Sequence, residues 1–155
     1  MVSKISWHEV AQAVENIADQ ISKDGFEADY IIGITTGGII PLGLLVKKIK
    51  IEKILTVSAK SYEKEKQGEL DISYLPEANL KGMKVLLIDE IADTGQTLKQ
   101  ISQILIDKYD TGEIRTASLV VNKKNCNFLP NYFALLTDKW VVFPWDKEEF
   151  PKYFE

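Results

Sequence analysis

The segment with the most evident chemistry is residues 85–98, which read VLLIDEIADTGQTL. The carboxylates of Asp89 and Glu90 can accept hydrogen bonds from a diol. The loop at 94–97 can offer backbone N–H groups and hydroxyls to a phosphate, and a helix that begins there adds the attraction of its dipole. A ribose 5-phosphate satisfies both halves of this segment.

A buried strand and a helix flank this segment. Residues 85–88 form an unbroken apolar run, typical of a strand buried on both faces of a parallel sheet. Acids do not belong inside such a strand, so we expect the acidic pair just past its carboxyl edge, where open α/β sheets bind ligands. Residues 98–109 carry apolar side chains at helical spacing. On composition alone, a structural strand-to-helix turn with solvated acids explains the segment equally well.

Strand and helix patterns alternate along most of the chain, which predicts an α/β fold with a central parallel sheet flanked by helices. A helix is expected between Ser6 and Gly25, because Ser6 and Glu9 have capping-box spacing. Residues 60–82 are polar and weakly periodic, which predicts a long mobile loop. The other expected elements are strands at 30–34, 53–60 and 114–122, a helix at 39–49, and two short strands in the aromatic tail.

The composition indicates one globular domain, because 155 residues are too few for two comfortable domains. A net charge of -4 gives no broad basic surface and argues against nucleic acid as a partner. The single cysteine, Cys126, cannot form a disulfide framework and favours a reducing, cytoplasmic location. We expect neither a signal peptide nor a membrane-spanning segment.

The string VLLIDEIADTGQT resembles the signature of type I phosphoribosyltransferases, and the resemblance covers nearly the whole chain. It implies that Asp89 and Glu90 contact the ribose hydroxyls of phosphoribosyl pyrophosphate (PRPP). It also implies a single domain over 1–155, with a core at about 26–124 and a small hood built from 1–25 and 125–155. The implied contacts to the 5-phosphate are Asp93, Thr94, Gly95, Gln96 and Thr97.

Asp93 resembles an acid that marks the 6-oxopurine members of this family. There the acid lies near N7 of the purine, so the resemblance implies a proton-transfer role for Asp93. A carboxylate beside a developing imidazole N–H is reasonable general acid/base chemistry. Taken alone, Asp93 also suits the N-cap of a helix, and both roles can hold together.

The string GITTGG is similar to the pyrophosphate loop of the family, which implies that Thr35, Thr36, Gly37 and Gly38 contact pyrophosphate. Related enzymes have a cis peptide just before the glycines, here between Thr35 and Thr36. Many relatives have Lys or Arg where this chain has Thr36, and that difference bears on how strongly pyrophosphate is held. Considered alone, TTGG could equally be an ordinary turn.

Two further segments resemble the catalytic loop and the base pocket of 6-oxopurine enzymes. Ser61 and Tyr62 match the Ser-Tyr pair that closes over the substrate and excludes water. In the tail, the resemblance implies that an aromatic stacks on the purine, that the next backbone carbonyl recognises its exocyclic group, and that an acid lies near the base and Mg²⁺. Those roles fall on Trp140, Val141 and Asp146, whereas Trp145 is expected in the core.

A lysine that donates to purine O6 in relatives follows the fourth strand. Counting forward along the strand puts Asn122 at this point, and counting back from the tail favours Lys123, which we select. The resemblance also implies Mg²⁺ beside Asp146, Asp89 and Glu90, mostly through PRPP oxygens rather than direct ligation. His8, the only histidine, is expected to have no catalytic role.

The resemblance therefore implies a purine salvage phosphoribosyltransferase, a pentosyltransferase that transfers the 5-phosphoribosyl group of PRPP to N9 of hypoxanthine, guanine or xanthine. The products would be a nucleoside 5-monophosphate and pyrophosphate. Family members imply a homodimer or homotetramer. Two alternatives stay open: a non-catalytic PRPP-sensing regulator of the same fold, and a phosphoribosyltransferase for adenine or a pyrimidine.

Overall fold

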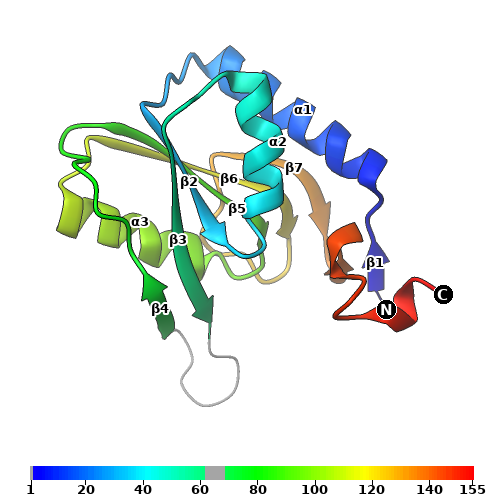
Figure 1. Cartoon of the computed structure of the whole chain (residues 1–155). Coiled ribbons are helices and arrows are strands. Elements are labelled where there is room, and N and C mark those ends of the chain that lie inside the picture. Colours follow the sequence, from blue (N-terminus) through cyan, green and yellow to red (C-terminus); the bar gives the residue numbers. More distant parts are fainter. Residues whose placement is uncertain (1, 62–68) are drawn as a thin grey trace.

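A six-stranded, mostly parallel sheet forms the centre of the protein in the computed structural model, which describes residues 2–61 and 69–155 (Figure 1). The strand order is β4-β3-β2-β5-β6-β7, and β4 alone runs antiparallel to its neighbour β3. The strands are β2 (Tyr30–Thr35), β3 (Ile54–Ser61), β4 (Leu70–Tyr74), β5 (Lys84–Ala92), β6 (Glu113–Asn122) and β7 (Tyr132–Thr137). The predicted fold class is confirmed.

Three helices cover the sheet: α1 (Trp7–Asp24), α2 (Ile39–Ile49) and α3 (Gln96–Tyr109). Alternate strand residues point to opposite faces, so Leu86 and Ile88 pack with α1 and α2, while Val85 and Leu87 pack with α3. Both faces are therefore buried, which explains the continuous apolar run in β5. No helix in the described residues is both long and apolar enough to cross a membrane.

Local sequence signals account for the limits of α1. The Ser6 hydroxyl accepts a hydrogen bond from the Glu9 N–H at 3.1 Å, and the Glu9 carboxylate accepts one from the Ser6 N–H at 2.8 Å. This is the predicted capping box. Gly25 ends the helix with a φ of 70°, a conformation that costs a glycine little.

The structure differs from the sequence prediction at β4 and β7. The polar 60–82 segment contains β4, an edge strand with mostly exposed side chains and hence little hydrophobic signal. The tail strand β7 pairs with β6 in the main sheet, so a core that stops at about residue 124 leaves out one strand of that sheet. The division into core and hood remains a prediction.

A small second sheet joins segments from the two ends of the described chain. Strand β1 (Val2–Lys4) pairs in parallel with β8 (Trp140–Val142), and Val2 lies opposite Trp140. Two short 3₁₀ helices follow, η1 (Pro144–Asp146) and η2 (Pro151–Tyr153). Strand β8 and η1 carry the tail residues that the sequence assigned to base binding.

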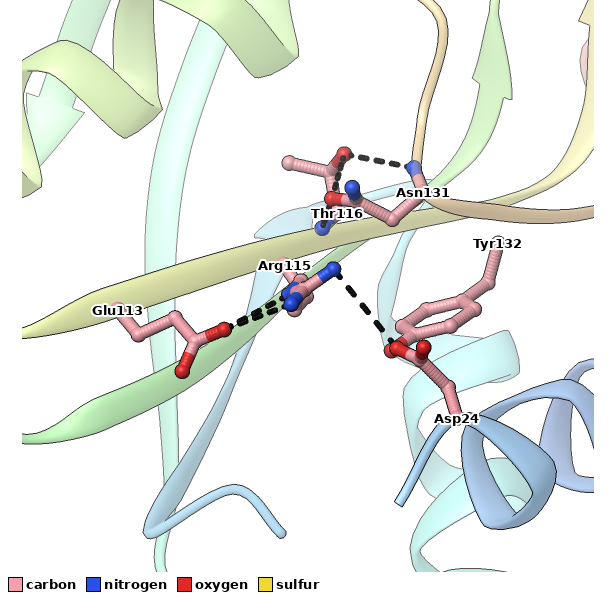
Figure 2. A network of polar contacts seen from close by, with 6 residues as sticks. All are labelled: Asp24, Glu113, Arg115, Thr116, Asn131 and Tyr132. Atoms are coloured by element: carbon pink, nitrogen blue, oxygen red, sulfur yellow. Dashed lines mark hydrogen bonds and ion pairs between the residues drawn. The ribbon is translucent and has the colours of Figure 1, made fainter. Parts of the chain in front are cut away.

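A network of paired polar groups lies at the amino edge of the main sheet, where β6 and β7 begin (Figure 2). Arg115 forms an ion pair with Glu113 at 2.8 Å and a longer one with Asp24 at 3.7 Å, and the Tyr132 hydroxyl donates to Asp24. Burial and this hydrogen bond raise the pKa of Tyr132. We call this the amino-edge network; its members are Asp24, Glu113, Arg115, Thr116, Asn131 and Tyr132.

Candidate active site

The acidic pair lies inside the last part of β5, not past its end as expected. β5 pairs with β2 as far as Ile88, but with β6 as far as Ala92. Asp89 and Glu90 therefore lie within β5, in the part of the strand that pairs with β6 but no longer with β2. This offset lets acids occupy a strand in which residues 85–88 are fully buried, a feature that the apolar run alone does not reveal.

Glu90 meets the predicted pyrophosphate loop directly. A Cβ added at Gly37 would lie 1.8 Å from Glu90 Oε2, so a side chain at this position would displace the carboxylate. At Gly38 an added Cβ would lie 2.5 Å from the Ile34 carbonyl oxygen and 2.8 Å from that of Ile88. The first turn of α2 begins immediately afterwards, so the positive end of its helix dipole lies next to this loop.

Three carboxylates form an acidic cluster, defined here as Asp89, Glu90 and Asp146. Burial, followed by the charge of Glu90, raises the pKa of Asp89 well above its ordinary value. Burial also raises the pKa of Asp146, with smaller contributions from Glu149 and Glu90 and an opposing hydrogen bond from the Phe143 N–H at 2.8 Å. Glu90 Oε2 is buried and has no hydrogen-bond partner among the described residues. Such a site attracts a cation or hydrogen-bond donors.

The loop between β5 and α3 has the backbone of an anion site. Gly95 is the N-cap of α3, with a φ of 83°, and no side chain caps the helix. The Thr94 hydroxyl accepts a hydrogen bond from the Gln96 N–H at 3.2 Å. Asp93 is not the N-cap of α3, so the prediction that it caps this helix is wrong. Its Oδ1 instead accepts hydrogen bonds from the amides of Asn122 and Asn125.

A segment that the sequence analysis did not assign to the site holds this loop in place. The Asn127 N–H donates to the Thr94 carbonyl at 3.0 Å, and Asn127 Oδ1 accepts from the Gln96 side chain at 2.9 Å. A Cβ at Gly95 would lie 2.4 Å from the Phe128 carbonyl oxygen. The string NKKNCN indicates turns, but only the fold shows that its asparagines contact the loop between β5 and α3.

The structure brings Asn122, rather than Lys123, to Asp93. Lys123 is exposed, and its backbone N–H donates to the Thr137 carbonyl at 2.8 Å. The pKa of Asp138 is lowered chiefly by Lys124, which lies 3.4 Å away, and to a smaller extent by Lys123. Contact between Lys123 and purine O6 remains a prediction.

The predicted base-binding residues come from β8 and the turn after it. Trp140 is 48% exposed and makes edge contacts with Phe150 at 4.8 Å and Tyr153 at 5.8 Å between ring centroids. Val141 is buried. Trp145, in contrast, stacks on Phe143 at 4.7 Å and packs against the main core, as predicted.

The remaining predicted residues lie at the carboxyl ends of β2 and β3. The peptide between Thr35 and Thr36 is cis, which confirms that prediction. The Thr35 and Ser58 hydroxyls are hydrogen-bonded at 2.6 Å, and Thr36 is exposed. Ser61 is the last residue of β3 and pairs with Leu70, whereas Tyr62 lies outside the described residues.

Comparison with known proteins agrees with this geometry. The phosphoribosyl transferase domain matches residues 5–149. A xanthine-guanine phosphoribosyltransferase of Desulfotalea psychrophila is 32% identical over 148 residues, which cover 93% of this chain and 86% of the relative. A namesake from Chromohalobacter salexigens is 27% identical over 143 residues, 92% of this chain and 82% of the relative. The crystal structure of a purine phosphoribosyltransferase from Pyrococcus horikoshii has 28% identity, a TM-score of 0.80 and 93% coverage of both chains.

Proposed function

The chain belongs to the phosphoribosyl transferase family, and on that premise we propose that it transfers the phosphoribosyl group of PRPP to N9 of a 6-oxopurine. The relatives named for xanthine and guanine support this class of base. The reaction breaks the bond between C1 of the ribose and the pyrophosphate oxygen and forms the C1–N9 bond. The purine loses one proton, and pyrophosphate leaves.

The contact between Glu90 and Gly37 is the observation that carries this proposal. It joins the acidic pair of β5 to the loop before α2, so that a diol site and an oxyanion site adjoin at the carboxyl edge of the sheet. The start of α3 supplies a second oxyanion site a few residues further along the chain. One ligand with a diol, a phosphate and a diphosphate suits this arrangement, and PRPP has all three.

The protein residues act mainly by positioning. In this scheme Asp89 and Glu90 accept hydrogen bonds from the ribose hydroxyls, while residues 94–97 bind the 5-phosphate through backbone N–H groups and hydroxyls. Residues 35–38 bind the leaving pyrophosphate. Trp140 supports the face of the purine, and Ser61 and Tyr62 shield the reacting carbon from water.

Asp93 is the proposed proton acceptor. Its exposed carboxylate follows β5 directly, on the same edge as the acidic pair, and it can take the proton that the purine loses. The scheme requires no covalent intermediate with the protein, because the fixed geometry of base and ribose itself lowers the barrier.

The acidic cluster fits a divalent cation bound to the diphosphate of the substrate. Mg²⁺ prefers oxygen ligands and neutralises leaving phosphate groups. Among the described residues no group of three His, Cys, Asp or Glu side chains is arranged to hold a metal by itself. Asp146, Asp89 and Glu90 would therefore hold the ion together with substrate oxygens. We also propose a cytoplasmic homodimer or homotetramer, as the resemblance implies.

The proposal is tested by assaying the purified protein with PRPP and Mg²⁺ and one base at a time: hypoxanthine, guanine, xanthine, adenine, orotate or uracil. We expect nucleotide formation only with one or more of the 6-oxopurines. Turnover of adenine or a pyrimidine alone would replace this assignment with another transferase. Absence of turnover with every base, while calorimetry detects PRPP binding, would favour a regulator.

A further inference from the structure

The register of β5 and β6 brings Asp93 beside Asn122. The two parallel strands pair Ala92 with Val121, and the next residues along each strand are Asp93 and Asn122. Asn122 is the last residue of β6 and only 9% exposed. Its side-chain amide donates to Asp93 Oδ1 at 2.9 Å. A buried amide at a strand end therefore meets the proposed proton acceptor.

Asn125 makes the second contact to the same oxygen. Its side-chain amide donates to Asp93 Oδ1 at 3.1 Å. Both side-chain hydrogen bonds that the Asp93 carboxylate accepts from the described residues therefore go to Oδ1. The other oxygen, Oδ2, accepts no hydrogen bond from the described residues and is left for a ligand.

The turn after β6 fixes which way the Asn122 amide points. Asn122 Oδ1 accepts hydrogen bonds from the backbone N–H groups of Lys124 at 3.0 Å and Asn125 at 3.3 Å. Because backbone N–H groups can only donate, the oxygen of this amide must face the turn and its nitrogen must face Asp93. The turn thus presents a fixed donor to Asp93.

We propose that Asn122 and Asn125 are positioning residues, which hold Asp93 Oδ1 so that Oδ2 faces N7 of the purine. This inference rests on the proposed function. Two amide donors on one oxygen restrict rotation of an exposed carboxylate, and proton transfer needs the acceptor within hydrogen-bond distance in the correct orientation. Asn122 stands at one of the two positions that the resemblance offers for the O6 lysine, and here that position contacts the proposed proton acceptor instead.

The decisive variant is Asn125→Ala. Asn125 is exposed, and its backbone N–H contact to Asn122 survives the substitution, so the turn is retained. With the 6-oxopurine that the wild type turns over best, we expect kcat to fall on the order of tenfold, the effect of losing a hydrogen bond to a charged group, while the KM for PRPP stays the same. Lys124→Ala, in the same turn, is the matched control and should keep wild-type kcat.

A double-mutant cycle separates positioning from a general structural role. In an Asp93→Ala background, Asn125→Ala should change kcat by less than about twofold, because the group through which it acts is gone. An equal loss in both backgrounds, or no loss in the wild-type background, would overturn the inference. If the wild type forms no nucleotide, the proposed function itself fails. If the wild type is active but the Asn125→Ala results differ from those expected, only this inference fails.

Asn122→Asp provides a second, independent variant. It keeps the oxygen that accepts from the turn but replaces the donor to Asp93 with an oxygen, so two carboxylates would face one another. We expect a larger loss of kcat than for Asn125→Ala, with a circular dichroism spectrum unchanged from the wild type. Wild-type kcat in a folded Asn122→Asp protein would contradict the inference.

Discussion

The two edges of the main sheet differ in whether their polar groups find partners within the chain. At the amino edge, Arg115, Asp24 and Tyr132 find partners within the chain, and Asn131 and Thr116 bond one another through side chain and backbone (Figure 2). At the carboxyl edge, burial and to a smaller extent neighbouring carboxylates raise the pKa of Asp89 and of Asp146, and one Glu90 oxygen is buried without a partner among the described residues.

This contrast distinguishes a structural polar network from a binding site. Buried polar groups in folded proteins are normally hydrogen-bonded, and each unpaired one costs free energy. The amino-edge network meets this requirement within the chain, so it holds α1 to β6 and β7. In the acidic cluster one Glu90 oxygen lacks such a partner among the described residues, and burial disfavours the charges of Asp89 and Asp146. A ligand that supplies hydrogen-bond donors and positive charge would therefore stabilise the cluster.

The largest expected effect is that of Asp93→Ala at the carboxyl edge. Removing a positioned general base lowers rates by roughly 10²- to 10⁴-fold, and we expect a loss of kcat in that range. PRPP should still bind, because the ribose contacts remain. Steady-state kinetics with calorimetry checks both points, and unchanged turnover would remove the proton-transfer role.

The next effect tests the contact between the acidic pair and the proposed pyrophosphate loop. Gly37→Ala places a methyl group 1.8 Å from the present position of Glu90 Oε2, so the carboxylate must move. A displacement of about an ångström can cost on the order of 10²-fold, and we expect that loss in kcat/KM for PRPP.

Gly43→Ala is the control for this substitution, because an added Cβ there meets open space on α2. It should retain activity and stabilise the helix slightly, since alanine is the better helix former. Equal kinetics for the two variants would contradict the predicted collision.

A smaller effect is expected for Asp89→Asn, which should weaken PRPP binding but stabilise the fold. Loss of the charge should weaken PRPP binding roughly tenfold or more. The pKa of Asp89 is higher in the folded state than in the unfolded chain, so its ionisation favours unfolding. The free energy of unfolding therefore falls as pH rises from the pKa of Asp89 in the unfolded chain toward its pKa in the folded state. The variant should therefore unfold at a higher temperature than the wild type at pH 7. Equal melting temperatures at pH 7 would contradict this.

The smallest effect should come from the amino edge. Tyr132→Phe loses one hydrogen bond to Asp24, which we expect to lower the free energy of unfolding by about 1 kcal/mol with kcat unchanged. The raised pKa of Tyr132 also predicts that wild-type stability falls as pH rises through the ordinary tyrosine value, because the unfolded chain ionises first. Urea denaturation of both proteins across alkaline pH measures this difference. A marked loss of kcat would show that the two edges are coupled.

Patterns of local sequence predict much of this molecule. The apolar run of β5, the capping box of α1 and the small residues before α3 each follow from one short segment. The edge strand β4 escaped prediction because few of its side chains are buried. The contacts from Asn122 and Asn125 to Asp93 depend on the register of β5 with β6, which no local pattern encodes.

The pairing of β1 with β8 makes the proposed base-binding strand depend on the order in which the chain folds. Trp140 lies in a strand whose only partner in the two-stranded sheet begins at Val2, so this ladder closes a loop over nearly the whole chain. Contacts between residues so distant in sequence form late in folding, because loop closure costs entropy. During synthesis β1 leaves the ribosome long before its partner exists, so the segment around Trp140 should be among the last parts to become native.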